Sequence, residues 1–277
     1  MRCIFCKSKS NNSKSVEHII PESLGNKDHI LPVGVVCDKC NNYIAREIEK
    51  PLLDSPYFKH MRFNGVIPNK RNLIPPIDGI HLQSLTHIQL HRSSREDGTI
   101  ISPALHVDGV PWIKSLLESK KGFLIIPVPS IPDEYIMSRF IAKVGLEVLV
   151  YRVIGVEGWK EEIIDKKELN ELRNYVRLGS PLNIWPFSYR SIYSPEKIFS
   201  ENGQSYQVLH EFDILVTPEN EYYIVVVIFG DEFALNLGGR EMEGYYKWLK
   251  ENNHQSPLYT EKNAVGRLDG GNETQQF

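Results

Sequence analysis

The segment that decides the fold of the N-terminal region reads Cys3-Ile4-Phe5-Cys6, then Glu17-His18-Ile19-Ile20-Pro21, then Cys37-Asp38-Lys39-Cys40-Asn41. It holds all four cysteines of the chain, as two Cys-x-x-Cys pairs. Each pair can form a tight turn that directs two thiolates at one metal ion, and two such pairs are typical of a tetrahedral Zn²⁺ site. A redox dithiol is the alternative, but it needs only one pair, and no βαβ unit is expected nearby. The sequence therefore predicts a structural Zn²⁺ held by Cys3, Cys6, Cys37 and Cys40.

Short secondary-structure elements are expected around these cysteines. Residues 16–20 are rich in apolar side chains and fit a strand, and a loop follows from Pro21. Residues 30–36 are apolar and β-branched, which favours a second strand. Residues 40–53 carry apolar side chains at helical spacing, and Pro51 is expected to end or kink that helix. The expected order is turn, strand, loop, strand, turn, helix.

This arrangement resembles the HNH endonucleases in their four-cysteine form, whose fold is the ββα-metal finger. The resemblance covers about residues 1–53 and rests on motifs that follow one another in the family's order at short spacings. It implies that Glu17 is a ligand of a catalytic divalent ion, Mg²⁺ or Mn²⁺. It also implies that His18 is the general base and that Asn41 supplies a second protein ligand through its amide oxygen.

Elementary chemistry supports these roles. Phosphodiester hydrolysis needs an activated water and stabilisation of the charge on the phosphate and on the leaving oxygen. A histidine titrates near neutral pH and can accept the proton of the water. A hard divalent cation held by oxygen ligands can neutralise the phosphate and the leaving oxygen. A module that only binds would not require the trio of Glu17, His18 and Asn41, so these residues favour an enzyme.

The family's middle asparagine, which orients the catalytic histidine, has no single counterpart in this chain. The sequence just before the second expected strand reads Asn26-Lys27-Asp28-His29-Ile30-Leu31-Pro32. Asp28 or His29 could replace the family's asparagine, or Asn26 could serve after a shift in the alignment. The sequence leaves these three possibilities open.

Residues 56–74 are expected to form a basic connector. No acidic residue occurs in residues 56–72, and Tyr57, Phe58 and Phe63 are interleaved with the positive charges. Such a combination can bind phosphates and stack on bases, although a solvated linker explains the same composition. The residues expected to contact nucleic acid are Lys59, Arg62, Lys70 and Arg71.

The chain is expected to divide into an HNH nuclease domain at 1–55, this connector, and a larger α+β domain at 75–277. In the larger domain the patterns predict strands at 82–90, 99–107 and 123–128, a hairpin from residue 206, and helices at 111–117, 135–153, 161–176 and 242–249. The tail from about residue 266 is polar and expected to be loose. No motif in this region points to chemistry, so targeting, sensing or regulation is its expected role. The fold class predicted for the whole chain is α+β.

Two further clusters invite a functional interpretation that the pattern does not favour. Three histidines lie between residues 81 and 91, and His87 and His91 have the i, i+4 spacing of a helical metal site. They fit equally well the outward face of a strand whose inward face carries Ile88 and Leu90, and we favour the strand. The acidic pair Asp231-Glu232 follows a strand and is expected to lie in a turn.

Composition excludes several classes of protein. Apolar residues make up 41% and charged residues 24% of the 277-residue chain, which is ordinary for a globular protein and excludes collagen and low-complexity sequences. The net charge of -3 excludes coating of nucleic acid by bulk charge. The longest strongly apolar run, residues 222–229, is far shorter than the ~20 residues that span a bilayer. No apolar signal-peptide core follows Met1, so a cytoplasmic protein without a membrane partner is expected.

The sequence as a whole therefore predicts a metal-dependent HNH endonuclease. Its expected partner is nucleic acid, with DNA favoured over RNA, and a regulatory partner or a homodimer fits the large second domain. HNH nucleases occur in restriction and phage defence, so the resemblance suggests that context. The alternative is a non-catalytic, zinc-stabilised module that binds nucleic acid or protein. A redox or metal-sensing zinc protein is a third possibility, which the residues around the cysteines do not support.

Overall fold

The computed structural model describes the whole chain except residues 94–97, 120–121, 202 and 260–277, so the expected loose tail lies outside the described residues. It contains helices and several sheets, which confirms the α+β class. The chain folds into two compact units. Unit 1 consists of Met1–Pro21, Asn26–Leu52 and the described residues from Asp133 on; unit 2 consists of Glu22–Gly25 and Leu53–Pro132.

This division differs from the expected one, which separates residues 1–55 from 75–277. The N-terminal part of unit 1, Met1–Pro21 with Asn26–Leu52, is called the finger segment below. It shares unit 1 with the C-terminal half of the chain. The physical reason is helix α5 (Glu134–Val153), which has 14 buried residues out of 20 and needs a partner on more than one side.

The finger segment has shorter strands than the sequence predicts. β1 (Glu17–His18) and β2 (Ile30–Leu31) pair antiparallel, with Glu17 opposite Leu31 and His18 opposite Ile30. β2 ends because Pro32 follows it and lacks a backbone N–H, and because Gly34 turns the chain at φ +89°. A Cβ on Gly34 would lie 2.9 Å from the carbonyl oxygen of Ser10, so only glycine fits this turn.

Pro51 does not end the helix that follows the second cysteine pair. α1 (Asp38–Ile44) continues through a π-helical turn (Ala45–Glu49) into α2 (Lys50–Asp54), so Pro51 is the second residue of α2. A proline inside a helix removes one hydrogen bond and crowds the carbonyl four residues earlier. The wider π turn directly before it is the local adjustment.

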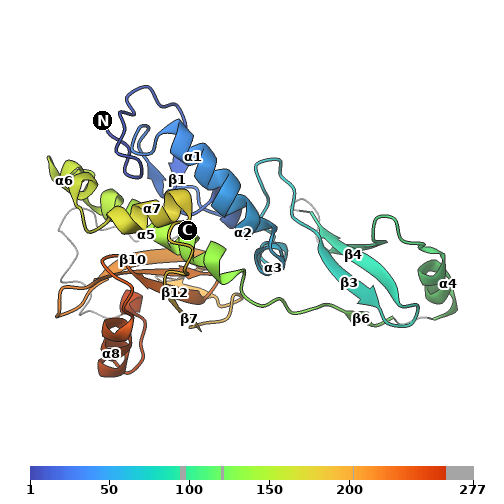
Figure 1. Cartoon of the computed structure of the whole chain (residues 1–277). Helices are drawn as coiled ribbons and strands as arrows, with labels where there is room; N and C mark the ends of the chain where they lie inside the picture. Colours follow the sequence, from blue (N-terminus) through green and yellow to red (C-terminus); the bar gives the residue numbers. More distant parts are fainter. Residues whose placement is uncertain (94–97, 120–121, 202, 260–277) are drawn as a thin grey trace. The chain divides into compact units, whose positions relative to one another are not determined.

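Unit 1 is built around α5 and a four-stranded antiparallel sheet. The sheet has the order β10 (His210–Val216), β11 (Tyr222–Ile228), β12 (Asp231–Asn236), β7 (Ser188–Ser191). One face of α5 packs on this sheet and another on the finger segment (Figure 1). Gly145 allows the close approach, since a Cβ there would lie 2.5 Å from Leu237 Cδ2 and 3.0 Å from Ile224 Cγ2.

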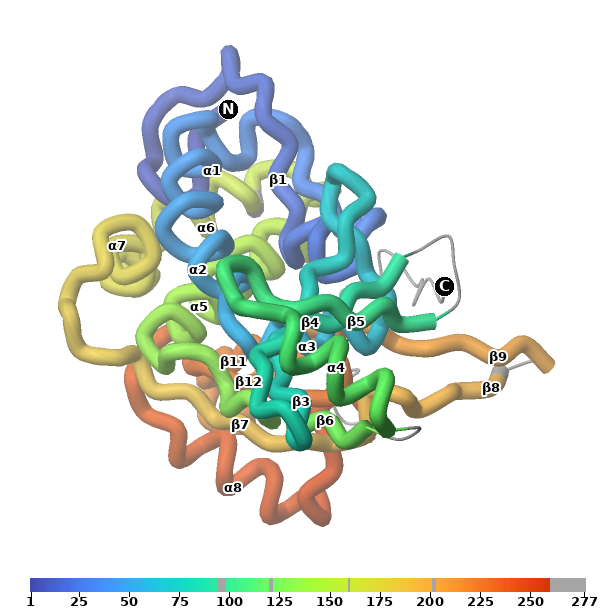
Figure 2. Tube along the Cα trace, turned by 90° about the vertical axis from the view of Figure 1, so that its right-hand side faces the viewer, coloured from blue at the N-terminus to red at the C-terminus, as the bar shows by residue number. Residues whose placement is uncertain are grey.

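Helix α8 (Glu243–Glu251) covers the opposite face of the same sheet (Figure 2). Tyr245, Trp248 and Leu249 of α8 pack against Tyr223, Val225 and Ala234 of the sheet. A two-stranded hairpin, β8 (Phe199–Glu201) with β9 (Gln204–Tyr206), extends away from the sheet in the same view, and a 3₁₀ turn (Pro257–Tyr259) follows α8.

Two expectations for unit 1 were wrong. The helix predicted at 161–176 is two helices, α6 (Trp159–Asp165) and α7 (Asn170–Leu178), because Arg173 takes the carbonyls of Ile163 and Lys166 that a continuous helix would use. Asp231-Glu232 does not lie in a turn but begins β12, since Phe229 and Gly230, both at positive φ, form the turn instead. Glu232 is buried and bound by Arg190 and Tyr245.

Unit 2 holds a second antiparallel sheet with the order β5 (Thr99–Pro103), β4 (Thr86–Arg92), β3 (Ile77–His81), β6 (Leu124–Ile125). Helices α3 (Pro56–Asn64) and α4 (Val110–Glu118) and a 3₁₀ turn (Glu22–Leu24) complete it. His87 and His91 lie on β4, on the face opposite to buried Ile88 and Leu90, which confirms the strand interpretation. Among the described residues, no helix is both long and apolar enough to cross a membrane.

Candidate functional site

The four cysteines come together in the finger segment. Their Sγ atoms all lie within 4.8 Å of one another, and Cys6 Sγ is 3.6 Å from Cys37 Sγ. Zn–S bonds of about 2.3 Å in a tetrahedron place sulfur atoms roughly 3.8 Å apart, so this spacing fits Zn²⁺. In the part of the chain that the structure describes, no other group of three or more histidine, cysteine or acidic side chains converges in this way.

The charge states of the four thiols depend on whether a cation is bound among them. A hydrogen bond from the Cys40 thiol lowers the pKa of Cys3 to about 4, while that contact together with burial raises the pKa of Cys40. Burial raises the pKa of Cys37 as well. One thiolate is therefore stabilised by protonated neighbours, and four thiolates at once need a positive ion among them.

Glu17 is directed into the protein from β1. Its side chain is only 7% exposed, and its Oε1 lies 2.7 Å from Nζ of Lys143 on α5. Burial raises the pKa of the Glu17 carboxyl, and the Lys143 ammonium opposes that rise. The residue expected to bind a divalent ion is thus already paired with a cation of the chain.

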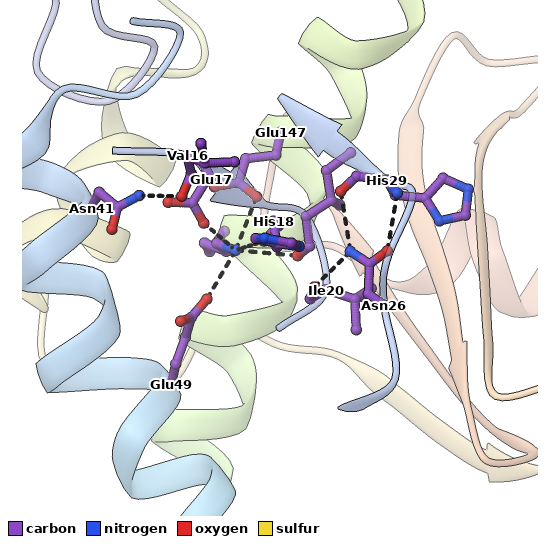
Figure 3. Close-up of polar contacts among 11 residues, drawn as sticks. Val16, Glu17, His18, Ile20, Asn26, His29, Asn41, Glu49 and Glu147 are labelled. Atoms are coloured by element: carbon purple, nitrogen blue, oxygen red, sulfur yellow. Dashed lines mark hydrogen bonds and ion pairs between the residues drawn. The ribbon is translucent and has the colours of Figure 1, made fainter. Parts of the chain in front are cut away.

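Lys143 is the centre of an ionic cluster that joins three elements, with Glu17, Glu49 and Glu147, labelled in Figure 3, around its ammonium. Its ammonium lies 3.1 Å from Glu49 Oε1 of the π-helical turn and 3.0 Å from Glu147 Oε2, one turn further along α5. Burial by itself would lower the pKa of Lys143, but the carboxylates of Glu147, Glu17 and Glu49 raise it well above its ordinary value. Burial raises the pKa of Glu147 well above its ordinary value too.

His18 lies next to this cluster on β1 and is partly exposed, in contrast to Glu17. Its backbone pairs with Ile30 of β2, and its carbonyl oxygen accepts a hydrogen bond of 2.8 Å from Lys143 Nζ. The neighbouring Ile19 carbonyl accepts a second bond of 3.2 Å from the same ammonium. The backbone that carries His18 is therefore held by both the sheet and α5.

Asn41 ties the start of α1 to β1. Its Nδ2 donates a hydrogen bond of 3.1 Å to the carbonyl oxygen of Val16, the residue before Glu17 (Figure 3). The next residue, Asn42, is exposed. The position directly after Cys40 is therefore the one that reaches the strand with Glu17 and His18.

Asn26 fixes the loop between β1 and β2. Asn26 is fully buried. Its Nδ2 donates hydrogen bonds to the carbonyl oxygens of Ile20 (2.7 Å) and His29 (3.1 Å). Its Oδ1 accepts hydrogen bonds from the backbone N–H groups of Asp28 (3.1 Å) and His29 (3.0 Å). Asp28 is exposed, and the ring of His29 packs edge-on against Phe212 at 4.8 Å between centroids. Of the three candidates for the middle position, Asn26 is the one whose side chain bonds both the loop and Ile20, just after β1.

Residues 3–56 match the family model of the HNH endonucleases. The match covers the cysteine pairs, Glu17, His18, Asn26 and Asn41. It stops before most of unit 2 and the C-terminal half of unit 1. No curated protein and no solved structure gives a significant match to the chain.

The HNH segment does not fit a divalent cation at Glu17 in this arrangement. The resemblance implies that Glu17 and Asn41 share the ion. Glu17 is instead paired with Lys143. Asn41 donates its Nδ2 to the Val16 carbonyl, a bond that does not use the amide oxygen expected to bind the ion. The four cysteines of the same segment, by contrast, do fit the structural Zn²⁺.

Sequence reasoning missed the residues outside the HNH segment that complete the site. Lys143 and Glu147 were assigned only to a buried helix. Glu49 lies inside the HNH segment, in the helix expected at 40–53, but was not singled out. A lysine and a glutamate at i, i+4 inside a helix that is apolar on several sides are a usable signal, because buried charges are normally paired.

The predicted nucleic-acid contacts do not all reach solvent. Arg62 lies on the buried face of α3 with Phe58, is 6% exposed, and has its pKa lowered by burial. Lys59 is half-buried, while Lys70 and Arg71 are exposed, and Lys70 pairs with Glu22 at 3.3 Å. Within the expected connector, Pro56–Asn64 is helical.

Proposed function

We propose that this chain is an HNH-type nuclease that hydrolyses phosphodiester bonds in nucleic acid, with DNA as its preferred substrate. The observation that carries the proposal is the position of His18. It is partly exposed on β1, and its backbone is held between Ile30 and Lys143, inside the segment that matches the HNH family. The HNH resemblance is also our reason to propose restriction or phage defence as the setting.

In this proposal His18 is the general base. An imidazole can take the proton of a water that attacks the phosphorus, and it needs a fixed orientation to do so. Asn26 supplies that rigidity from the loop side, and Lys143 from the side of α5. Asn41 keeps the first turn of α1 against the same strand.

Contacts to the nucleic-acid backbone are proposed for Lys59, Lys70 and Arg71, the three predicted residues whose side chains reach solvent. Phosphate contacts of this kind position a duplex without reading its sequence. Arg62 is left out of this set because it is buried.

A second candidate function is favoured by one observation, the ion pair between Glu17 and Lys143. A finger whose acidic residue is neutralised by a lysine can act as a zinc-stabilised module that binds nucleic acid without cutting it. This module would keep the cysteine site and the basic residues but would have no use for the imidazole of His18.

The deciding experiment is a cleavage and binding assay with the full-length, zinc-loaded protein on plasmid DNA, single-stranded DNA and RNA. Each substrate is incubated with Mg²⁺, Mn²⁺ or EDTA, which also measures the metal dependence that the resemblance implies. Loss of a general base costs about 10²–10⁴-fold in rate, so His18→Ala should lose most cleavage at unchanged zinc content. His87→Ala, at an exposed position on β4, is the matched control.

The two candidates give different results in this assay. Cleavage by wild type and not by His18→Ala supports the nuclease. Binding without cleavage in every metal condition supports the binding module. Equal cleavage by both proteins would show that the active site lies elsewhere.

A further inference from the structure

The ammonium of Lys143 has the surroundings of a bound cation. Five oxygen atoms lie between 2.7 and 3.2 Å from Nζ: one carboxylate oxygen each from Glu17, Glu49 and Glu147, and the carbonyl oxygens of His18 and Ile19. They come from β1 and its continuation, from the π-helical turn and from α5. A lysine side chain therefore does here what a metal ion does in many active sites, which is to gather oxygen ligands from separate elements.

This ammonium cannot leave by a simple side-chain rotation. The Lys143 side chain is 0% exposed, and α5 is buried between the finger segment and the sheet. A change of rotamer that took Lys143 to water would have to cross packed side chains. It would also leave the buried carboxylates of Glu17 and Glu147, and the half-buried one of Glu49, without their counter-ion, which is strongly unfavourable.

A divalent cation on Glu17 would compete directly with this ammonium. A Mg²⁺–oxygen bond is about 2.1 Å long, so an ion on Oε1 of Glu17, the oxygen 2.7 Å from Nζ, would sit within roughly 5 Å of Nζ. Two positive charges at that separation inside the protein repel strongly, because little water screens them. The same carboxylate therefore serves either the lysine or the metal.

We propose that Lys143 is a built-in cation that takes the place of the divalent ion at Glu17 and positions the strand of His18. It is a positioning residue supplied by α5, outside the segment that matches the HNH family. This inference rests on the proposed function, because it concerns the same site. Its test measures metal binding and not cleavage, so the inference about Lys143 and the proposed nuclease function can fail separately.

The test is a titration of Mn²⁺ into zinc-loaded full-length protein, with free Mn²⁺ counted by electron paramagnetic resonance. Wild type and Glu17→Gln should bind Mn²⁺ equally weakly. Lys143→Met removes the positive charge but keeps a side chain of similar length. This variant should bind one Mn²⁺ at least ten-fold more tightly than wild type. Lys143→Met/Glu17→Gln should lose that gain, and Lys143→Arg, which keeps the positive charge, should behave as wild type.

The wild-type measurement keeps the proposal falsifiable even if Lys143→Met does not fold. If wild type binds one Mn²⁺ and Glu17→Gln abolishes that binding, the carboxylate is open to metal and the proposal is overturned. A folded Lys143→Met protein that gains no Mn²⁺ site would also overturn it and leave Lys143 a purely structural residue. Lys143→Met/Glu147→Gln is the second variant to measure, since it removes one buried negative charge together with the lysine.

Discussion

Arg173 of α7 donates a hydrogen bond of 2.9 Å from Nε to the carbonyl oxygen of Ile4, which lies between the first two cysteines. The same guanidinium donates to the carbonyls of Ile163 and Lys166 and to the side chain of Asn170. Arg173 is 2% exposed. The turn that carries Cys3 and Cys6 is therefore held by the C-terminal half of the chain as well as by any metal.

Removal of this clamp should loosen the zinc site. Arg173→Met leaves the Ile4 carbonyl buried without its donor, and such losses cost about 1–3 kcal/mol for each unsatisfied group. We expect a lower free energy of unfolding in urea and faster zinc release to a chelator. Arg177→Met, on the same helix and less buried, is the control. Equal zinc-release rates for both variants would contradict a clamping role.

Zinc itself should be required for the finger segment. We expect elemental analysis to find one zinc per chain in wild type and none in Cys37→Ala, which lacks one of the four ligands. The finger segment of Cys37→Ala should then unfold, because structural zinc contributes on the order of 10 kcal/mol to a small metal-dependent domain. Since the finger segment packs on α5, Cys37→Ala should also lower the melting temperature of the C-terminal half. Purified wild type without zinc would refute this prediction, and Ser13→Ala, in the same region, serves as the control for mutation alone.

The N-terminal site could be predicted from sequence because its residues are close together in the chain. The cysteine pairs, Glu17, His18 and Asn41 lie within 41 residues, and the spacing of short motifs carries their chemistry. Lys143 is 125 residues from His18, and no spacing rule connects them. Only the packing of α5 against the finger segment brings the ammonium to the strand.

The segment after Asp54 shows a different limit. The basic, acid-free composition suggested a connector, but Pro56 stands in the first turn of a helix, where proline is common. Ser55 caps α3 by accepting a hydrogen bond from the Phe58 N–H. Once the segment is helical, Phe58 and Arg62 share a face by their i, i+4 spacing. That is why one of the four predicted basic contacts is buried.

The three remaining basic residues give a prediction about salt. Each phosphate contact adds about 0.9 to the slope of log affinity against log salt on duplex DNA. Lys59→Ala/Lys70→Ala/Arg71→Ala should therefore reduce that slope by about two to three and weaken binding at low salt. A triple variant with the wild-type slope would show that this segment is only a solvated surface. Lys114→Ala, at an exposed position on α4, is the single-charge control.

Asn26 should be essential for the loop that supports His18. Asn26→Ala leaves two carbonyls and two N–H groups without their partner, and we expect a loss of about 2–4 kcal/mol in unfolding free energy. Asn26→Asp should not rescue it, because a carboxylate oxygen would face the carbonyls of Ile20 and His29. Asn42→Ala, at an exposed position, should change stability by less than about 0.5 kcal/mol. Urea unfolding measures all three, and a stable Asn26→Ala would rule out this role.

His29 should make the stability of unit 1 depend on pH. Its ring packs among Tyr151, His210 and Phe212, and burial lowers its pKa below the ordinary 6.5. Nearby Asp28 raises that pKa and Arg152 lowers it, but burial is the largest cause.

The sign of the effect follows from proton binding. Below pH 6.5 the unfolded chain binds a proton at His29 that the folded protein binds less readily, so unfolding takes up protons and stability falls as the pH falls. His29→Phe keeps the aromatic packing and removes the titrating group. We expect a flatter curve of unfolding free energy between pH 7.5 and pH 5, measured in urea at each pH. His87→Gln removes an exposed histidine and should follow wild type, because His29 is retained. If His29→Phe loses as much stability as wild type over this range, another titrating group carries the dependence.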